Sequence, residues 1–383
     1  MSSKLSVMTP SLDAQFIENT NKFALELYKQ IILENQRKNV VISPFSIGTC
    51  LSFAGMGAVG STADEIFTGL KHGTASDKHL VADIYGNLLQ NIASNQSLNI
   101  ANKIYFKHGS TLRPNFQDIA TASFRSEVEA VDFAENETAA KTINRWVEQK
   151  TNDKIKNFIT PNTVNQSTLM VLVNAIHFKG SWTHPFETWN TMPAPFWTTA
   201  TESVEVSMMH LKKKFKYGVF DELNMSALEM TYSDSDVSML ILLPNDRDGL
   251  VKLEENILNI DVGDILGKMY KEEVNVALPK FKIEFDVELS ETLKKLGMGK
   301  MFSGDADFSD LFEQSESLCV SKIVHKAFIE VNEEGVEAAA ATGMIMVGCC
   351  YGQQPTYFEA DRPFLCLLQR NSQLMFVASI YQP

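Results

Sequence analysis

The sequence has 383 residues, of which 44% are hydrophobic and 21% are charged, as in ordinary globular proteins with a large core. Asp and Glu outnumber Lys and Arg by 47 to 34, so a net charge of -13 would repel nucleic acids and anionic membranes. We therefore expect no nucleic-acid and no membrane partner. Because no stretch rich in Pro, Gly and Ser interrupts the chain, we expect one domain over residues 1–383.

Signals for the cellular compartment point in two directions. The first ten residues lack the apolar block of a secretory signal, and the five cysteines cannot all pair within one chain, which together predict a cytoplasmic protein. No metal-type spacing joins these cysteines to histidines, so no metal site and no cofactor are expected. Four glycosylation sequons keep a secreted protein open as the alternative. The sequons begin at Asn95, Asn136, Asn165 and Asn224, and the cysteines are Cys50, Cys319, Cys349, Cys350 and Cys366.

Helical periodicity is strongest in the first part of the chain. Apolar residues at helical spacing predict an amphipathic helix containing Phe16, Phe23, Leu27 and Ile31. A short buried strand at 40–42 and a helix of small residues through 54–57 should follow. Further along the chain, the patterns predict a strand over 99–106 and a surface helix over 139–158.

Strands dominate the remainder. An almost continuous apolar run over 169–178 predicts a strand buried on both faces, and Lys212–Lys214 is expected in a solvated turn. Helices crowded into the first half, with strands in the second, indicate an α+β fold. Further strands are expected at 237–243, 274–278, 323–331, 364–368 and 374–380, the last two around a turn at 370–372.

Residues 332–350 fit no single local structure. Four consecutive alanines favour helix, but the flanking Gly335, Val336 and Gly343 oppose it. As a strand, the segment would present one uncharged face, which could slide between existing strands without burying a charge. A loop exposed in one state and inserted in another is one hypothesis, and an exposed loop without a role is the other. The uncharged face would comprise Val336, Ala338, Ala340, Thr342, Met344 and Met346.

Several motifs in order along the chain resemble the serpin family. Residues 39–46 read Asn-Val-Val-Ile-Ser-Pro-Phe-Ser, and residues 57–66 are similar to the family stretch that follows. Residues 173–182, read as Val-Asn-Ala-Ile-His-Phe-Lys-Gly-Ser-Trp with Pro185-Phe186 after them, look like the family's central signature. Residues 358–364 resemble its carboxyl-terminal signature. The resemblance extends from the first predicted helix to the last predicted strand.

This resemblance implies a serpin fold with a large central mixed sheet, smaller sheets, eight to nine helices and an exposed reactive-centre loop at about 333–357. It also implies a shutter beneath the place where the sheet opens, formed by Ser43, Ser46, Asn174 and His325, and a breach at Trp182 where the loop enters. These residues would control movement and would not be catalysts. The implied hinge comprises Glu333, Glu334, Gly335, Val336, Glu337, Ala338, Ala339, Ala340, Ala341 and Thr342.

The family mechanism implies that the protein is not an enzyme but an inhibitor, and that each molecule is used up when the target protease cleaves it. A serine protease would cut the loop, remain bound as a covalent acyl-enzyme, and be trapped as the loop inserts as a strand. Counting by family spacing from Gly335, and back from Pro363, places the scissile bond at Cys349-Cys350, with a shift to Cys350 or Tyr351 left open. We expect a monomer whose partner is the target protease.

The residue before the cut indicates the class of target. A protonated cysteine is small and apolar, which suits an elastase-like, chymotrypsin-like or subtilisin-like protease, with a papain-like cysteine protease as a second choice. Val336 departs from the Thr or Ser that most often follows the hinge glycine in inhibitory members. A non-inhibitory carrier, storage protein or chaperone therefore remains an alternative, and a cysteine hydrolase a remoter one. Adjacent Cys349 and Cys350 could also make the loop redox-sensitive.

Overall fold

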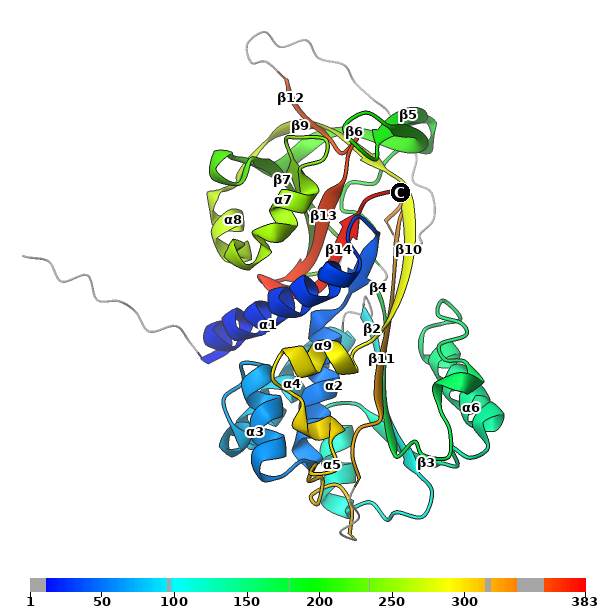
Figure 1. Ribbon diagram of the computed structural model, residues 1–383. Helices are drawn as coiled ribbons and strands as arrows, with labels where there is room; N and C mark the ends of the chain where they lie inside the picture. Colours follow the sequence, from blue (N-terminus) through cyan, green and yellow to red (C-terminus); the bar gives the residue numbers. More distant parts are fainter. Residues whose placement is uncertain (1–11, 95–97, 179, 234, 314–317, 336–354) are drawn as a thin grey trace, which may run out of the picture.

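A computed structural model describes residues 12–94, 98–178, 180–233, 235–313, 318–335 and 355–383 (Figure 1). Within these ranges the chain forms nine α-helices, and short 3-10 turns connect several elements. The helices are α1 (Leu12–Glu34), α2 (Pro44–Gly57), α3 (Gly60–Gly69), α4 (Lys78–Ser94), α5 (Pro114–Ala122), α6 (Asn136–Lys150), α7 (Leu250–Glu255), α8 (Val262–Lys268) and α9 (Ser290–Lys295).

The strands of the described chain form two mixed sheets. One has five strands in the order β10-β11-β4-β2-β3, and the other has nine, in the order β1-β14-β13-β8-β7-β6-β9-β12 with β5 paired to β6. The α+β class and a large mixed sheet accompanied by a smaller one are confirmed. The strands are β1 (Val40–Ile42), β2 (Leu98–Lys107), β3 (Glu127–Val131), β4 (Met170–Phe178), β5 (Thr191–Trp197), β6 (Ser203–Phe220), β7 (Met225–Thr231), β8 (Val237–Pro244), β9 (Tyr270–Pro279), β10 (Phe281–Glu288), β11 (Lys322–Val331), β12 (Thr356–Glu359), β13 (Phe364–Arg370) and β14 (Gln373–Ile380).

Two local predictions from the sequence were wrong. The helix expected over 139–158 ends at Lys150, because Asn152 and Asp153 adopt positive φ angles of 52° and 59° and turn the chain. Lys212–Lys214 lies in β6 and not in a turn. There the antiparallel partner β9 supplies Glu273, whose carboxylate lies 2.9 Å from the Lys212 ammonium, so an extended conformation is compatible with three successive lysines.

The five-stranded sheet has helices on both faces (Figure 1). Alternate residues of β2, β4 and β11 pack on one side against α6, where Val173, Phe328 and Val147 share an apolar cluster. The other residues of these strands, such as Leu172 and Ile323, join the main core on the side of α2. Burial on both faces explains the continuous apolar run of β4.

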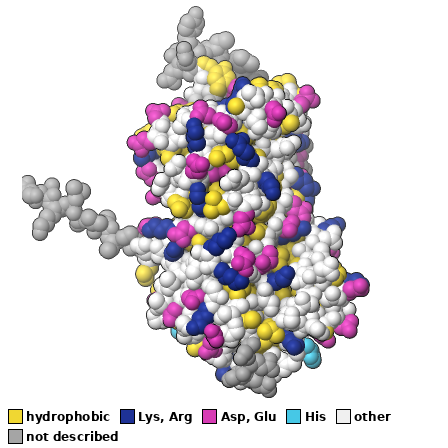
Figure 2. Space-filling view, in the orientation of Figure 1, with side chains coloured by type: hydrophobic (Ala, Val, Ile, Leu, Met, Phe, Trp, Pro, Cys, Tyr) yellow, Lys and Arg dark blue, Asp and Glu magenta, His cyan; other side chains and the backbone are white. Residues whose placement is uncertain are grey.

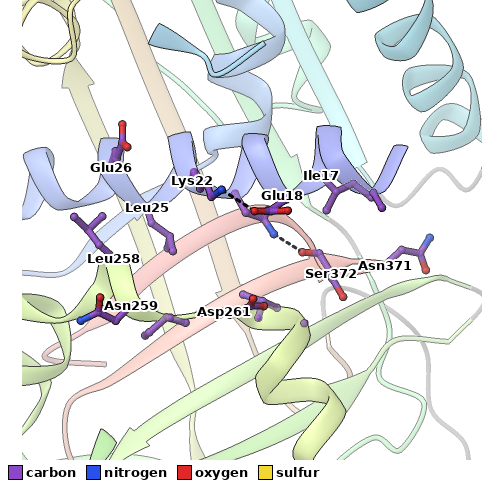
Figure 3. A pocket seen from close by; sticks show the side chains of 15 residues that line it. Ile17, Glu18, Lys22, Leu25, Glu26, Leu258, Asn259, Asp261, Asn371 and Ser372 are labelled. Atoms are coloured by element: carbon purple, nitrogen blue, oxygen red, sulfur yellow. Dashed lines mark hydrogen bonds and ion pairs between the residues drawn. The ribbon is translucent and has the colours of Figure 1, made fainter. Parts of the chain in front are cut away.

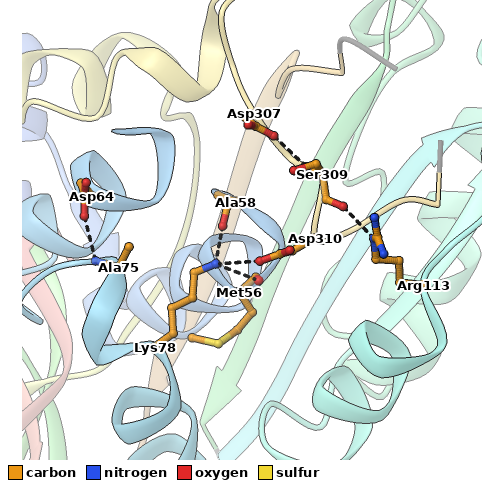
Figure 4. Close-up of polar contacts among 9 residues, drawn as sticks. All are labelled: Met56, Ala58, Asp64, Ala75, Lys78, Arg113, Asp307, Ser309 and Asp310. Carbon is orange, nitrogen blue, oxygen red and sulfur yellow. Dashed lines mark hydrogen bonds and ion pairs between the residues drawn. The ribbon is translucent and has the colours of Figure 1, made fainter. Parts of the chain in front are cut away.

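Helix α2 is fixed at both ends. Ser43 caps its amino terminus, where the side-chain oxygen accepts from the Ser46 N–H at 3.2 Å. At its carboxyl terminus the Lys78 ammonium donates to the carbonyl oxygens of Met56 and Ala58 and also contacts Asp310 (Figure 4). These contacts satisfy carbonyls that the helix leaves unpaired. The helix therefore provides a fixed support beneath the sheet.

Acidic and basic side chains are interspersed over the face of the molecule seen in Figure 2. No helix within the described ranges is long and apolar enough to cross a membrane.

Candidate conformational site between strands β4 and β11

Strands β4 and β11 are direct neighbours in the five-stranded sheet. They run parallel, and their registered pairs extend from Lys322 opposite Val171 to Phe328 opposite His177. No strand of the described chain lies between them. Parallel neighbours that are distant in sequence are joined only by ladder hydrogen bonds and side-chain packing, so the contact between β4 and β11 depends on these alone.

The predicted shutter residues come together beneath this pair. His325 of β11 and Asn174 of β4 are opposite each other in the ladder, and both are fully buried. The His325 Nε2 atom accepts a hydrogen bond from the backbone N–H of Ser43 at 3.1 Å. Its Nδ1 atom lies 2.5 Å from the Asn174 Oδ1 atom. The histidine thus connects the two strands to the start of α2.

Burial keeps the His325 ring neutral. Removal from water lowers the pKa of His325 to about 3. A neutral imidazole has one donor and one acceptor nitrogen, and a backbone N–H can only donate. Because Nε2 accepts from Ser43, the proton is on Nδ1, which donates to Asn174. This bond crosses the gap that an entering strand would occupy.

The serines and one further asparagine complete the network. The Asn174 Nδ2 atom donates to Ser46 Oγ at 2.5 Å and to Asn102 Oδ1 on β2. Ser43 Oγ donates to the carbonyl oxygen of Met375 at 2.6 Å. Asn102 was not predicted from the sequence. The available signal was a polar residue among the alternating apolar residues of β2, on the face that packs toward α2.

Trp182, the predicted breach residue, lies just beyond the end of β4. Its ring stacks on Tyr232, with centroids 4.3 Å apart and an interplanar angle of 16°. The indole Nε1 donates to the carbonyl oxygen of Asn332 at 3.1 Å, and the Trp182 backbone N–H donates to the carbonyl oxygen of Glu334 at 3.1 Å. Trp182 therefore holds the chain immediately after β11 against the chain immediately after β4.

A tight turn at Asn332–Gly335 reverses the chain after β11. The backbone groups of Asn332 and Gly335 bond reciprocally, at 3.3 and 3.2 Å. Gly335 also forms an antiparallel bridge to Ser181, on the extension of β4. The residue at the end of this turn is thus paired on both sides, between the extensions of β11 and β4.

Glu333, the first predicted hinge residue, is anchored by its side chain. One carboxylate oxygen accepts from Thr191 Oγ1 at 2.9 Å, and the other lies 2.8 Å from the Lys280 ammonium. Partial burial would raise the pKa of Glu333, but the hydrogen bonds from Lys280 and Thr191 outweigh it and lower the pKa. The Phe186 N–H donates to the Glu333 carbonyl oxygen at 2.8 Å.

The two described ends of the loop region lie on different sheets. Gly335 follows β11 of the five-stranded sheet, whereas Thr356 begins β12, which pairs in parallel with β9 of the nine-stranded sheet. The hinge positions after Gly335, from Val336 to Thr342, and the predicted scissile pair Cys349 and Cys350 lie outside the described residues.

A pocket of 560 Å³ is located away from this site, beside α1 (Figure 3). Ile17, Lys22 and Leu25 of α1 face Asp261 and the turn between β13 and β14. None of the predicted site residues within the described ranges lines it. Among the described residues, no group of three or more His, Cys, Asp or Glu side chains could hold a metal ion.

The sequence was then compared with known families. Residues 18–383 match the family model described as serpin (serine protease inhibitor). The chain belongs to the serpin family. The resemblance predicted from the motifs is therefore confirmed.

This serpin has relatives of nearly full length. It is 38% identical to serine protease inhibitor 42Dd of Drosophila melanogaster over 361 residues, covering 94% of this chain and 95% of that protein. It is 35% identical to leukocyte elastase inhibitor of Sus scrofa over 371 residues, covering 94% and 98%. Among solved structures, Serpin48 of the insect Tenebrio molitor is 35% identical, with a TM-score of 0.88 over 98% of this chain and 100% of that one. The predicted serpin fold is confirmed.

Proposed function

We propose that this serpin is a single-domain, monomeric inhibitor of serine proteases that is consumed by the protease it traps. The observation that carries the proposal is the double pairing of Gly335, between Asn332 after β11 and Ser181 after β4. This residue already occupies the first position of an additional antiparallel strand. In the intact chain, attachment of the far end of the loop to β12 opposes any further entry.

The proposed reaction begins as ordinary proteolysis. The protease's serine oxygen attacks the carbonyl carbon of Cys349, the bond to Cys350 breaks, and the new amine of Cys350 receives the proton removed from the serine. The acyl-enzyme then remains on Cys349. Release from β12 allows residues 336–349 to enter the sheet, and at about 3.3 Å per residue they carry the protease about 45 Å. Gain of ladder hydrogen bonds and buried surface drives the movement.

Register supports the proposed role of the shutter. Thr342 is seven residues after Gly335, Asn174 is seven before Ser181, and His325 is seven before Asn332. A ladder continued from the two bridges would therefore place Thr342 between Asn174 and His325, with its side chain toward α2. A threonine hydroxyl both donates and accepts, so it could replace the bond that separation of the two strands breaks.

The target class follows from the proposed scissile residue. Protonated Cys349 suits the shallow or apolar pocket of an elastase-like, chymotrypsin-like or subtilisin-like protease. Similarity to a protein named leukocyte elastase inhibitor supports the same choice. A papain-like cysteine protease is the second candidate.

Incubation with elastase, chymotrypsin, subtilisin and trypsin, followed by denaturing electrophoresis and intact mass measurement, tests the proposal. We expect a denaturant-resistant complex with one of the first three proteases and a released fragment beginning at Cys350. Loop cleavage by every protease with full protease activity retained would contradict inhibition and favour a non-inhibitory serpin.

We further propose a reducing, cytoplasmic location. Within the described ranges Cys50, Cys319 and Cys366 are free thiols, and unpaired cysteines are typical of such compartments. Subcellular fractionation tests this location. Glycans at the exposed Asn165 or Asn224 would instead indicate secretion.

A further inference from the structure

A row of buried polar side chains crosses three strands of the five-stranded sheet. Asn102 of β2 is opposite Asn174 of β4, which is opposite His325 of β11. Their exposed fractions are 3%, 0% and 0%. Hydrogen bonds run without interruption from the Ser43 N–H through His325 and Asn174 to Asn102 Oδ1. We call this set the polar row.

One backbone group fixes the direction of every bond in the polar row. The Ser43 N–H can only donate, so the neutral His325 ring must donate through Nδ1. The Asn174 oxygen must then face His325, and its NH2 group must face away. Ser46 Oγ does not select this orientation, because a hydroxyl can donate or accept. On the far side Asn102 Oδ1 accepts from the Asn174 NH2 group and so reinforces the orientation that His325 requires.

Within the described residues, the Asn102 side chain makes no hydrogen bond through its other polar atom. Its Nδ2 atom is buried and has no hydrogen-bond partner among them. A buried donor without an acceptor opposes folding, so an apolar residue would be favoured here unless the oxygen had a role. The oxygen's contact is with the one residue whose orientation determines the bond across β4 and β11.

We propose that Asn102 is a positioning residue for sheet opening, acting through Asn174; this inference rests on the proposed function. Entry of a strand would increase the β4 to β11 spacing from about 4.8 Å to about 10 Å and break the bond between Asn174 and His325. The Asn102 bond does not cross that gap. By holding the Asn174 amide with its oxygen toward His325, Asn102 strengthens the closed sheet and slows its opening.

The first test does not depend on protease inhibition. NMR of protein labelled with 15N at histidine follows exchange of the His325 Nδ1 proton with solvent. In Asn102→Leu the Asn174 amide can turn over, and we expect about tenfold faster exchange, since one hydrogen bond holds the orientation. Asn102→Asp retains an acceptor oxygen, and burial raises the pKa of the new carboxyl, so at a pH where this carboxyl is protonated exchange should stay within about twofold of wild type.

The second test measures the rate at which the uncleaved protein converts, on mild heating, to a more stable form. Asn102→Leu and His325→Leu should each accelerate conversion about tenfold, and the double variant should convert no faster than the faster single one. Asn21→Leu is the control: Asn21 makes two hydrogen bonds, to Ser372 and Leu374, remote from the polar row. The acceleration caused by Asn21→Leu should be independent of His325→Leu, so the conversion rate of that double variant should reflect the product of the two single accelerations.

Equal rates of His325 proton exchange in Asn102→Asp and Asn102→Leu would overturn the positioning role. So would a conversion rate in the double variant equal to the product of the two single accelerations. If His325→Leu does not fold, the exchange measurement on the Asn102 variants alone decides. If loop cleavage of the wild type produces no gain in thermal stability, the proposed function fails, while the exchange measurement still accepts or rejects the role of Asn102.

Discussion

Gly335 lies so close to Gly180 that a Cβ on Gly335 would be 2.4 Å from the Gly180 carbonyl oxygen. The φ angle of Gly335 is 104°, a conformation that L side chains rarely adopt. Both the backbone angle and the space therefore require glycine at the residue that begins the proposed inserted strand.

We expect Gly335→Ala to destabilise the uncleaved form by about 3 kcal/mol, since strain and a backbone clash combine. Gly297→Ala is a matched control, because Gly297 has φ 86° with open space around it and its replacement should cost about 1 kcal/mol. Thermal unfolding of both variants measures the difference. Equal losses would show that the contact with Gly180 is unimportant.

Acid should weaken the closed sheet through His325. The folded pKa is about 3 and the unfolded value about 6.5, so the unfolded chain binds the additional proton as the pH falls. The stabilisation is fully present above about pH 6.5 and declines by up to about 1.4 kcal/mol per pH unit toward pH 3. We expect His325→Gln to lose this component of the pH dependence, as measured by unfolding between pH 7 and 4.5. A variant with the wild-type slope would contradict the assignment.

A charge at Thr342 should prevent insertion if the register from Gly335 is right. Thr342→Arg would place a guanidinium between β4 and β11, at a cost of several kcal/mol, so the protein should become a substrate that the protease cleaves and releases. Glu337→Arg is the control, because that position already carries a charge and should still form complex. The stoichiometry of inhibition distinguishes the two. Unimpaired trapping by Thr342→Arg would refute the register.

The buried Lys103 organises the edge of the sheet below α6. Its ammonium lies 3.0 Å from Glu127 and 2.6 Å from Glu129, and 5.0 Å from the centre of the Trp146 ring. Burial would raise the pKa of Glu127, but the hydrogen bonds from Lys150 and Lys103 lower it to about 2.

We expect Lys103→Met to raise the pKa of Glu127 toward 4.5 and to cost about 2 kcal/mol at pH 7, less than for a fully buried pair because the carboxylates are partly exposed. This loss should diminish below about pH 4.5, where Glu127 becomes protonated in the unfolded chain. NMR titration and unfolding measure both effects. Lys268→Met, which removes an exposed ion pair with Asp264, should change stability little.

Specificity should follow residue 349. Cys349→Arg supplies the basic side chain that trypsin-like pockets bind, so trypsin inhibition should accelerate at least 100-fold, while elastase inhibition declines. Second-order inhibition rate constants give the answer. If trypsin still cuts elsewhere and forms no complex, the scissile bond is not at Cys349.

The sequence predicted the site where local pattern and family motif coincide. The apolar run of β4 was found because burial on both faces imposes a local rule, whereas Ser43 and Ser46 were found through the family motif that contains them. Lys280 and Thr191 could not be predicted from the sequence, because their contact with Glu333 depends on how the two sheets meet. The predicted helix ran past Lys150 because Ile155 and Phe158 join the same apolar cluster without being helical. The role of Asn102 could not be predicted without knowing that Asn174 lies opposite it in the ladder.

The position of β14 has a consequence for biosynthesis. It lies between β1 and β13 in the nine-stranded sheet, so a growing chain cannot complete that core until residues 373–380 have left the ribosome. The five-stranded sheet needs only residues up to Val331, and the loop emerges next. Until β12 (Thr356–Glu359) emerges and pairs with β9, nothing anchors the far end of the loop. Slow translation or truncation in this window should favour premature insertion, so the yield of chains with an uninserted loop should depend on how quickly the residues after Val331 are made.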